Sequence, residues 1–183
     1  MTKGSDKWDE IFGYKPCIMC EGTIKTYLRP NDFTENEDGD NTTNDIEDAG
    51  DDRYDVMIEF PRMGVNITTS GSVITVSITN EPNNSKFQYR AFTKNGVVQD
   101  YLYLGAYLAS DEVNNKMQSI SNAAPLTNIS LTDAIAAAQK RGSGYDIMGF
   151  YQWTYVQCLY LLKYGNLNSQ AALGKGYVSG SAK

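Results

Sequence analysis

The sequence predicts an α+β fold in which a β-rich part precedes two helices. Segments with a period of two, typical of half-buried strands, fill much of the stretch from Tyr54 to Tyr107. Two segments with helical start and stop signals follow Ser130. The chain shows no internal repeat, and strands followed by helices are typical of the α+β class.

The chain is expected to begin with an arm and an acidic loop, residues 1–53, ahead of a main domain, residues 54–183. An apolar group from Trp8 to Tyr14 favours a short helix or turn, which Pro16 ends. Thr23 to Leu28 alternates enough to predict a strand.

The stretch from Asp32 to Asp55 holds 11 of the chain's 22 acidic residues and almost no apolar ones. Burial cannot offset the entropy cost of ordering such a segment, so we predict a solvated loop or linker. An EF-hand does not fit, because a loop with Gly39 as its turn glycine would start at Thr34 and end at Asp45 instead of Glu. Adventitious Ca²⁺ binding stays an alternative.

The strands of the main domain are predicted from alternation and turn signals. Val56 to Phe60 ends at Pro61, and Asn95-Gly96 marks a turn. A hairpin is predicted where residues 65–68 and 73–78 alternate on either side of Ser70-Gly71-Ser72. Further strand character is expected in residues 87–92 and 101–107.

Two helices are predicted after the strands. Ser130 begins a capping box that ends with Asp133, an alanine-rich segment continues to Lys140, and Gly142 stops it. The second helix should run from about Tyr151 to Lys163 and stop at Gly165. It is apolar on nearly all sides, which predicts a buried helix.

The composition excludes several classes of function. The net charge of −6 and pI near 4.6 argue against binding to nucleic acid or to anionic membranes, which Lys and Arg drive. The chain has no histidine, so it cannot form a Ser-His-Asp or Cys-His catalytic set by itself. Residues 150–162, the longest apolar-rich run, are too short to span a bilayer. No signal peptide is evident at the N-terminus.

The cysteines are expected to be reduced and to have no ligand role. Cys17 and Cys20 form a single C-x-x-C, which without a second pair or a histidine cannot complete a zinc site. It also lacks the helix-start context of a thioredoxin-like motif. Cys158 lies in an apolar run and is predicted to be a small core residue.

Several short motifs, taken in their order and spacing, are spread over most of the chain. One piece is the strand Asp55-Val56-Met57-Ile58-Glu59-Phe60-Pro61, followed by Arg62. The most specific pieces are residues 142–145, 157–161 and 168–177. The remaining pieces are residues 22–23, 27–33, 76–79, 81–83, 103–107 and 119–121. Together these motifs resemble a family of phage and prophage tail or fibre proteins of Gram-positive hosts, which has lysine at the position of Arg62.

The resemblance implies a C-type-lectin-like fold, related in shape to formylglycine-generating enzymes and to phage variable receptor-binding proteins. In that fold a helical half precedes a second half of strands and loops that carries the ligand surface. The family continues with a segment like Gly-Ile-Glu-Asp-Phe-Trp-Gly-Asn. Because the sequence stops at Lys183 without it, we expect the domain to be incomplete at its C-terminus. A core face left uncovered in this way would need a partner chain.

Three candidate motifs are interpreted as structural. Glu81-Pro82-Asn83 shares its letters with mannose-binding lectins but follows a strand and lacks their Trp-Asn-Asp, so we predict a turn. Gly174-x-Gly176 lacks the context of a phosphate loop. Asp51, Asp52 and Asp55 could supply a carboxylate pair for glycan cleavage, but solvated charge is the better interpretation.

The resemblance therefore implies a bacteriophage virion protein, located in the virion after synthesis in the bacterial host cytoplasm. It would serve as a tail fibre, baseplate or head-fibre component in host-surface attachment. The alternative is a structural protein, such as a capsid decoration or collar element, that binds no ligand. Expected partners are other virion proteins, further copies of the chain and a host cell-wall glycan. We expect no enzymatic activity and no catalytic, cofactor or metal site.

Overall fold

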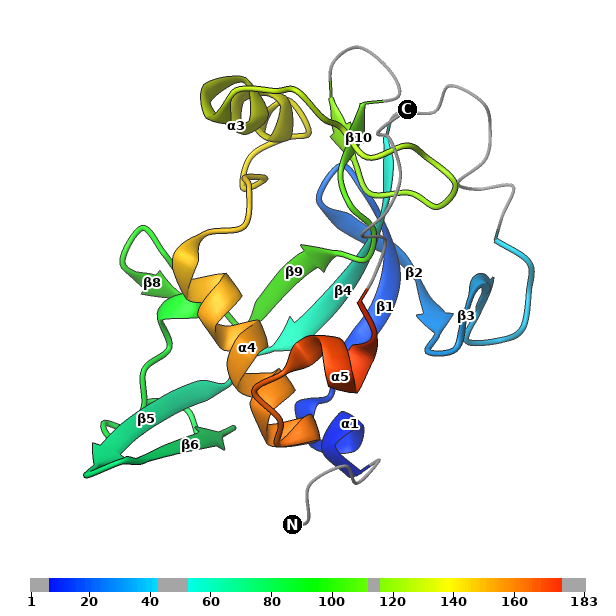
Figure 1. The fold of residues 1–183 in the computed structure, drawn as a ribbon. Coiled ribbons are helices and arrows are strands. Elements are labelled where there is room, and N and C mark those ends of the chain that lie inside the picture. The colour runs from blue at the N-terminus through cyan, green and yellow to red at the C-terminus, as the bar shows by residue number, and fades with distance from the viewer. Residues whose placement is uncertain (1–6, 43–52, 112–115, 176–183) are drawn as a thin grey trace. The chain divides into compact units, whose positions relative to one another are not determined.

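The computed structural model describes residues 7–42, 53–111 and 116–175, and these form a mixed α+β structure as predicted (Figure 1). The larger strands are β1 (Lys15–Cys20), β2 (Thr23–Arg29), β3 (Asp32–Asn36), β4 (Tyr54–Pro61), β5 (Gly64–Ser70), β6 (Val73–Thr79) and β9 (Tyr101–Gly105). Two-residue strands are β7 (Thr93–Lys94), β8 (Val97–Val98), β10 (Ser110–Asp111) and β11 (Met117–Gln118). The helices are α1 (Lys7–Phe12), the 3₁₀ turn η1 (Arg90–Phe92), α3 (Leu131–Gln139), α4 (Phe150–Tyr164) and α5 (Ser169–Leu173).

These elements belong to two compact units that alternate along the chain. The described part of the first unit comprises residues 7–14, 60–102 and 148–175. The described part of the second comprises residues 15–42, 53–59, 103–111 and 116–147. Their boundaries do not coincide with the expected division between residues 53 and 54.

The second unit is organised by the five-stranded sheet, whose order is β3-β2-β1-β4-β9. β1 pairs antiparallel with β2 on one side and with β4 on the other. The turn between β1 and β2 uses Glu21 and Gly22, both at positive φ, a conformation that glycine adopts without strain. Ile18, Leu28 and Val56 form the apolar core of this unit. The strand predicted at residues 23–28 is confirmed, whereas β1 was not predicted.

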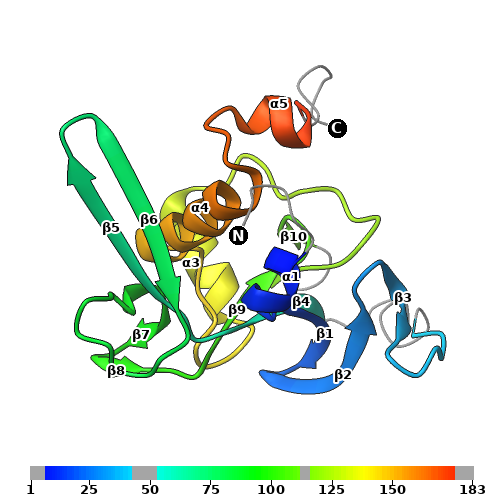
Figure 2. The ribbon, with the colours of Figure 1, turned by 90° about the horizontal axis from the view of Figure 1, so that it is seen from below.

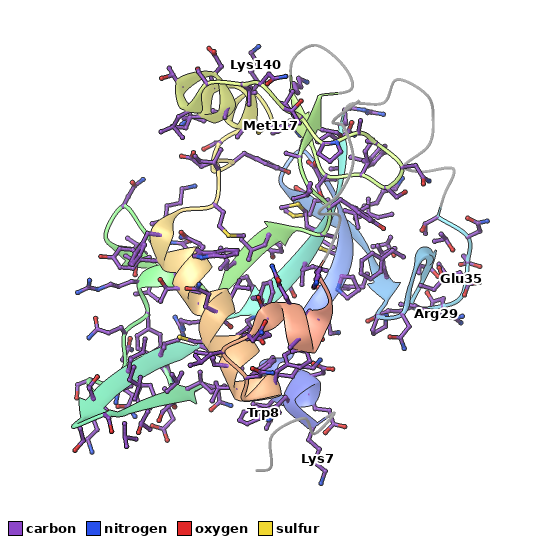
Figure 3. The ribbon with its side chains drawn as sticks, in the orientation of Figure 1. Lys7, Trp8, Arg29, Glu35, Met117 and Lys140 are labelled. Atoms are coloured by element: carbon purple, nitrogen blue, oxygen red, sulfur yellow. The ribbon has the colours of Figure 1, made fainter. Side chains whose placement is uncertain are left out.

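Part of the acidic stretch is a strand instead of a loop. β3 covers Asp32 to Asn36 and pairs antiparallel with β2. An ion pair between Arg29 and Glu35 links the two strands, and Figure 3 shows both side chains together. Thr34, where the rejected EF-hand loop would have started, lies within this strand. Residues 43–52 lie outside the described residues.

The helix α3 begins as its sequence predicts. The Ser130 side chain accepts a hydrogen bond from the Asp133 backbone N–H at 3.1 Å, and the Ser130 hydroxyl donates to the Asp133 carboxylate at 2.7 Å. This satisfies one of the backbone donors that a helix N-terminus leaves open. The helix ends at Gln139, and Gly142 follows at a positive φ of 139°.

The first unit is built around an aromatic core. Phe12, Met63, Phe92, Tyr155 and Leu159 are buried together. The ring of Tyr155 meets Phe92 edge to face, with centroids 5.1 Å apart. Such contacts add about 0.5–1.5 kcal/mol to the burial of the rings. The predicted short N-terminal helix is α1, and it supplies Phe12 to this core.

The predicted hairpin of the first unit is confirmed as β5 and β6, in register from Gly64 opposite Thr79 to Ser70 opposite Val73. The predicted Asn95-Gly96 turn is also confirmed, with both residues at positive φ between β7 and β8. The prediction of a strand at residues 87–92 is wrong. Residues 90–92 form the 3₁₀ turn η1, which buries Phe92 in the aromatic core.

Candidate functional site

The first turn of α4 carries three exposed aromatic side chains. Phe150 is 76% exposed, Tyr151 44% and Trp153 53%. Phe150 and Tyr151 contact each other edge to face, with ring centroids 5.6 Å apart. We call these three residues the α4 aromatic surface. Large aromatic rings left exposed as a group are characteristic of recognition surfaces.

The prediction of a buried helix at α4 is wrong. Its buried residues are Tyr155, Cys158 and Leu159, which share one face. Within the first unit α4 contacts η1, β6 and α1. The sequence of α4 is apolar on nearly all sides, but its unit packs against one face only, so Phe150 and Trp153 on the opposite face remain exposed.

Neighbouring residues in the first unit hold Tyr151 and the two ends of α4 in place. The Gln152 side chain donates a hydrogen bond to the Ala91 carbonyl at 3.0 Å. The Arg90 guanidinium donates to the Tyr151 hydroxyl at 2.9 Å and lies 5.2 Å from the ring centroid. At the other end of the helix, Lys163 binds both carboxylate oxygens of Asp9 in α1, at 2.6 and 2.7 Å. The exposed rings therefore stand on a braced helix.

A second candidate site is a group of charged and polar side chains buried around Asp55 in the second unit. The Arg141 guanidinium donates through Nε, at 3.0 Å, and through Nη2 to the same carboxylate oxygen of Asp55. The other oxygen accepts from the Ser119 backbone N–H at 2.9 Å. Arg141 Nη2 also donates to the Tyr54 carbonyl at 3.2 Å. Asp55 is 2% exposed and Arg141 8%.

The interpretation of Asp55 as solvated charge is therefore wrong. Asp55 lies at the start of β4, where both it and Val56 are buried, and its acidic context in the sequence gives no sign of this burial. Burial raises the pKa of Asp55 above its ordinary value, while the charge of Arg141 and the Ser119 N–H act in the opposite direction. Asp51 and Asp52 lie outside the described residues.

Glu59 forms a separate buried cluster on the same strand. It accepts hydrogen bonds from the hydroxyls of Tyr27, at 3.1 Å, and Tyr103, at 2.7 Å. Burial raises the pKa of Tyr103, and the Glu59 carboxylate raises it further. Sequence reasoning did not single out Glu59. The sequence could have indicated it, because Glu59 follows Asp55 by four residues. In a strand, where side chains alternate between the two faces, this spacing places both carboxylates on one face of β4.

Asp55 and Glu59 do not form a glycosidase pair. Four residues of extended strand separate their Cα atoms by about 13 Å, at about 3.3 Å per residue. Retaining enzymes need carboxyl groups about 5 Å apart and inverting ones at most about 9.5 Å. Each carboxylate is also engaged on both oxygens, that of Asp55 by Arg141 and Ser119, and that of Glu59 by the half-buried Tyr27 and Tyr103. The role of both carboxylates is structural, because their hydrogen bonds attach β4 to the neighbouring segments of the second unit.

The cysteines are free, as predicted. Cys17 is buried in β1, and burial together with the Glu59 charge raises the pKa of its thiol to about 12. Cys158 is buried on α4, which confirms its predicted core position. Among the described residues, no group of three or more Cys, Asp and Glu is placed to hold a metal ion.

The remaining candidate motifs form turns. Asn83 lies at a positive φ of 61°, and the Asn84 side chain donates to the Glu81 carboxylate at 2.8 Å, which confirms a turn at residues 81–83. Gly174 ends α5 at a positive φ, and Gly176 lies outside the described residues. In the part of the chain that the structure describes, no helix is long and apolar enough to cross a bilayer.

No protein-family model, curated protein or solved structure matches the chain. The resemblance to phage tail and fibre proteins therefore stays a prediction from the sequence motifs.

Proposed function

We propose that this chain is a bacteriophage virion protein that contributes to host-surface attachment through the α4 aromatic surface. The supporting observation is the exposure of Phe150, Tyr151 and Trp153 on a braced helix. The motif resemblance to tail and fibre proteins gives the virion context. The resemblance also implies a C-type-lectin-like fold, and the order of sheet followed by helices is compatible with it. Because that fold carries its ligand surface in a later half, the α4 aromatic surface is proposed on the exposure of its rings alone.

The proposed ligand class is an uncharged cell-wall glycan. Aromatic rings offer broad apolar faces that can cover the C–H faces of sugar rings, while a tyrosine hydroxyl remains available for hydrogen bonding. The net charge of −6 opposes binding to anionic wall polymers. The Arg90 guanidinium donates a hydrogen bond to the Tyr151 hydroxyl, so this cation holds the Tyr151 ring in place and is not free to bind an anionic ligand.

The test is binding of the full chain to purified cell walls from the host of the phage or prophage that encodes it. Trp153→Ala should weaken binding by about 30-fold, equivalent to about 2 kcal/mol for a central aromatic contact. Leu131→Ala is the matched control, because Leu131 is 68% exposed on α3 and lies outside the proposed surface. It should leave binding unchanged.

Equal binding by wild type and Trp153→Ala would refute the role of this surface. Failure of the folded wild-type chain to bind walls would refute attachment. If the chain were nevertheless found in purified particles, the alternative of a capsid decoration or collar element would be favoured.

A further inference from the structure

The hairpin of β5 and β6 extends well beyond the core that anchors it. Figure 2 shows it as a long ribbon whose tip projects past α4 within the first unit. Val65 and Ile78, near its base, pack against the aromatic core. Toward the tip, Ile67 is 49% exposed and Ile74 is 67% exposed. Their exposure shows that these outer residues lack a covering layer. A two-stranded ribbon without such a layer is only marginally stable in water.

The hairpin register shows which backbone groups face outward. Val65 exchanges both backbone hydrogen bonds with Gln88, at 2.9 and 2.8 Å, so its N–H and C=O point away from β6. Its partner Ile78 must then point its N–H and C=O away from β5, because these groups alternate along an antiparallel ladder. The same holds two and four residues earlier, at Val76 and Ile74. Among the described strands, none pairs with this outer edge of β6.

The same residues form an apolar stripe. Cross-strand partners share a face, so Ile67 lies beside Val76, and Thr69 lies beside Ile74. From Gly64 to Thr79 the hairpin contains no charged residue, and its strands are rich in Val, Ile and Thr. Soluble proteins commonly protect such an edge with lysine, proline or a bulge. This edge has none of these protections between Val73 and Thr79.

We propose that β6 pairs antiparallel with β6 of a second copy of this chain, around a two-fold axis at Thr75. In this register Ile74 lies opposite Val76 of the other copy, so apolar side chains meet on one face. About four backbone hydrogen bonds form between the outward groups of these residues. The contact is isologous, as in most homodimers.

Charge favours a second copy as the partner. Each chain carries a net charge of −6, so two copies repel each other over most of their surfaces. The hairpin is a neutral segment between Arg62 and Glu81 at which identical chains can approach without bringing like charges together. A charged partner would find nothing complementary between these two residues. This inference does not depend on the proposed attachment function.

The first test is sedimentation equilibrium of the full chain over a range of concentrations up to about 100 µM. The wild type should shift from its chain mass of 20.3 kDa toward the mass of two chains. Ile74→Lys should remain at the single-chain mass. Thr69→Lys should dimerise like the wild type, because Thr69 is the cross-strand partner of Ile74 on β5 and lies away from the pairing edge.

The second test is disulfide capture in a Cys20→Ser background, in which both remaining native cysteines are buried. Thr75→Cys places two thiols opposite each other on the axis, with Cα atoms about 4.5 Å apart, a separation that a disulfide tolerates. Under mild oxidation it should give a covalent dimer. Thr68→Cys, at the partner position on β5, should not.

The proposal is overturned if the wild type stays a single chain at every concentration or forms trimers. It is also overturned if the two lysine variants associate alike, or if both cysteine variants cross-link equally. Circular dichroism verifies that each variant is folded. If Ile74→Lys does not fold, the disulfide comparison decides the question.

Discussion

Asp55 and Arg141 should behave as one energetic unit, which can be tested by removing each partner. In Asp55→Asn the guanidinium of Arg141 keeps the Tyr54 carbonyl but loses the carboxylate that receives two of its hydrogen bonds. In Arg141→Met the carboxylate keeps the Ser119 N–H but loses its counter-ion. Both side chains are at most 4% exposed, so water cannot replace the lost partner without reorganisation.

Each single substitution is expected to lower the free energy of unfolding by about 3–5 kcal/mol, as for other buried ion pairs broken on one side. The double variant Asp55→Asn/Arg141→Met should cost no more than either single one, since it leaves no buried charge. The Asn side chain can still accept from Ser119. Against a total stability of about 5–15 kcal/mol for a domain, each single loss is large.

The two single variants should differ in their dependence on pH. An arginine cannot deprotonate, but a buried carboxyl can protonate. Burial already raises the pKa of Asp55 above 3.8, and removal of Arg141 takes away the main opposing influence. A carboxyl whose pKa is higher in the folded state stabilises the protein as pH falls through that value. Arg141→Met should therefore recover stability as pH falls through the raised pKa of Asp55, and Asp55→Asn should not.

Urea unfolding followed by far-UV circular dichroism measures these changes. Both tryptophans belong to the first unit, so tryptophan fluorescence provides a control for effects outside the unit that contains the ion pair. Single losses below about 1 kcal/mol, which are typical of exposed pairs, would contradict the reasoning. So would losses that add in the double variant.

Three further predictions concern single features of the units. The Tyr155 hydroxyl is buried without a hydrogen-bond partner among the described residues, so Tyr155→Phe should raise the free energy of urea unfolding by up to about 1 kcal/mol; a loss above that amount would indicate a missed partner. Burial raises the pKa of Asp9, but hydrogen bonds from Lys163 and Tyr14 outweigh this effect and lower it. The Asp9–Lys163 pair therefore stabilises the folded protein above pH 3.8, and this stabilisation is lost as pH falls through the lowered pKa. The thermal-stability difference between wild type and Lys163→Met, worth at most about 1 kcal/mol for a partly exposed pair, should therefore vanish in strong acid, and a difference that persists there would contradict this. Because burial raises the pKa of Cys17 to about 12, alkylation of the native chain near pH 8 followed by mass spectrometry should modify Cys20 before Cys17; the reverse order would refute the burial argument.

The local signals in the sequence predicted much of the fold. The Ser130 cap, the Asn95-Gly96 turn and the hairpin from Gly64 to Thr79 are all set by nearby residues, and all three are present. The strand β1 escaped prediction because most of its residues are buried, so it shows no period-two alternation. Residues 87–92 contain strand-forming aromatics but turn at η1, where tertiary packing of Phe92 overrides local preference.

The candidate site was harder to predict than the fold. The partnership of Asp55 and Arg141 joins residues 86 positions apart, and no local pattern encodes it. Asp55 stands at the end of an acidic run, so the composition suggested that its side chain is exposed to solvent. In the structure its position in β4 buries that side chain. For α4 the composition suggested burial all around, whereas exposure of Phe150 and Trp153 depends on how many elements pack against the helix. Both errors arise because composition does not specify which neighbours a side chain meets.

The most direct test of the central claim is a cryo-electron microscopy map of intact phage particles released by the organism whose genome encodes this chain. The attachment proposal predicts that the chain lies in a tail, baseplate or fibre appendage, with Phe150, Tyr151 and Trp153 facing outward. A map in which the chain is absent, or in which these three rings are buried against the capsid, would contradict it.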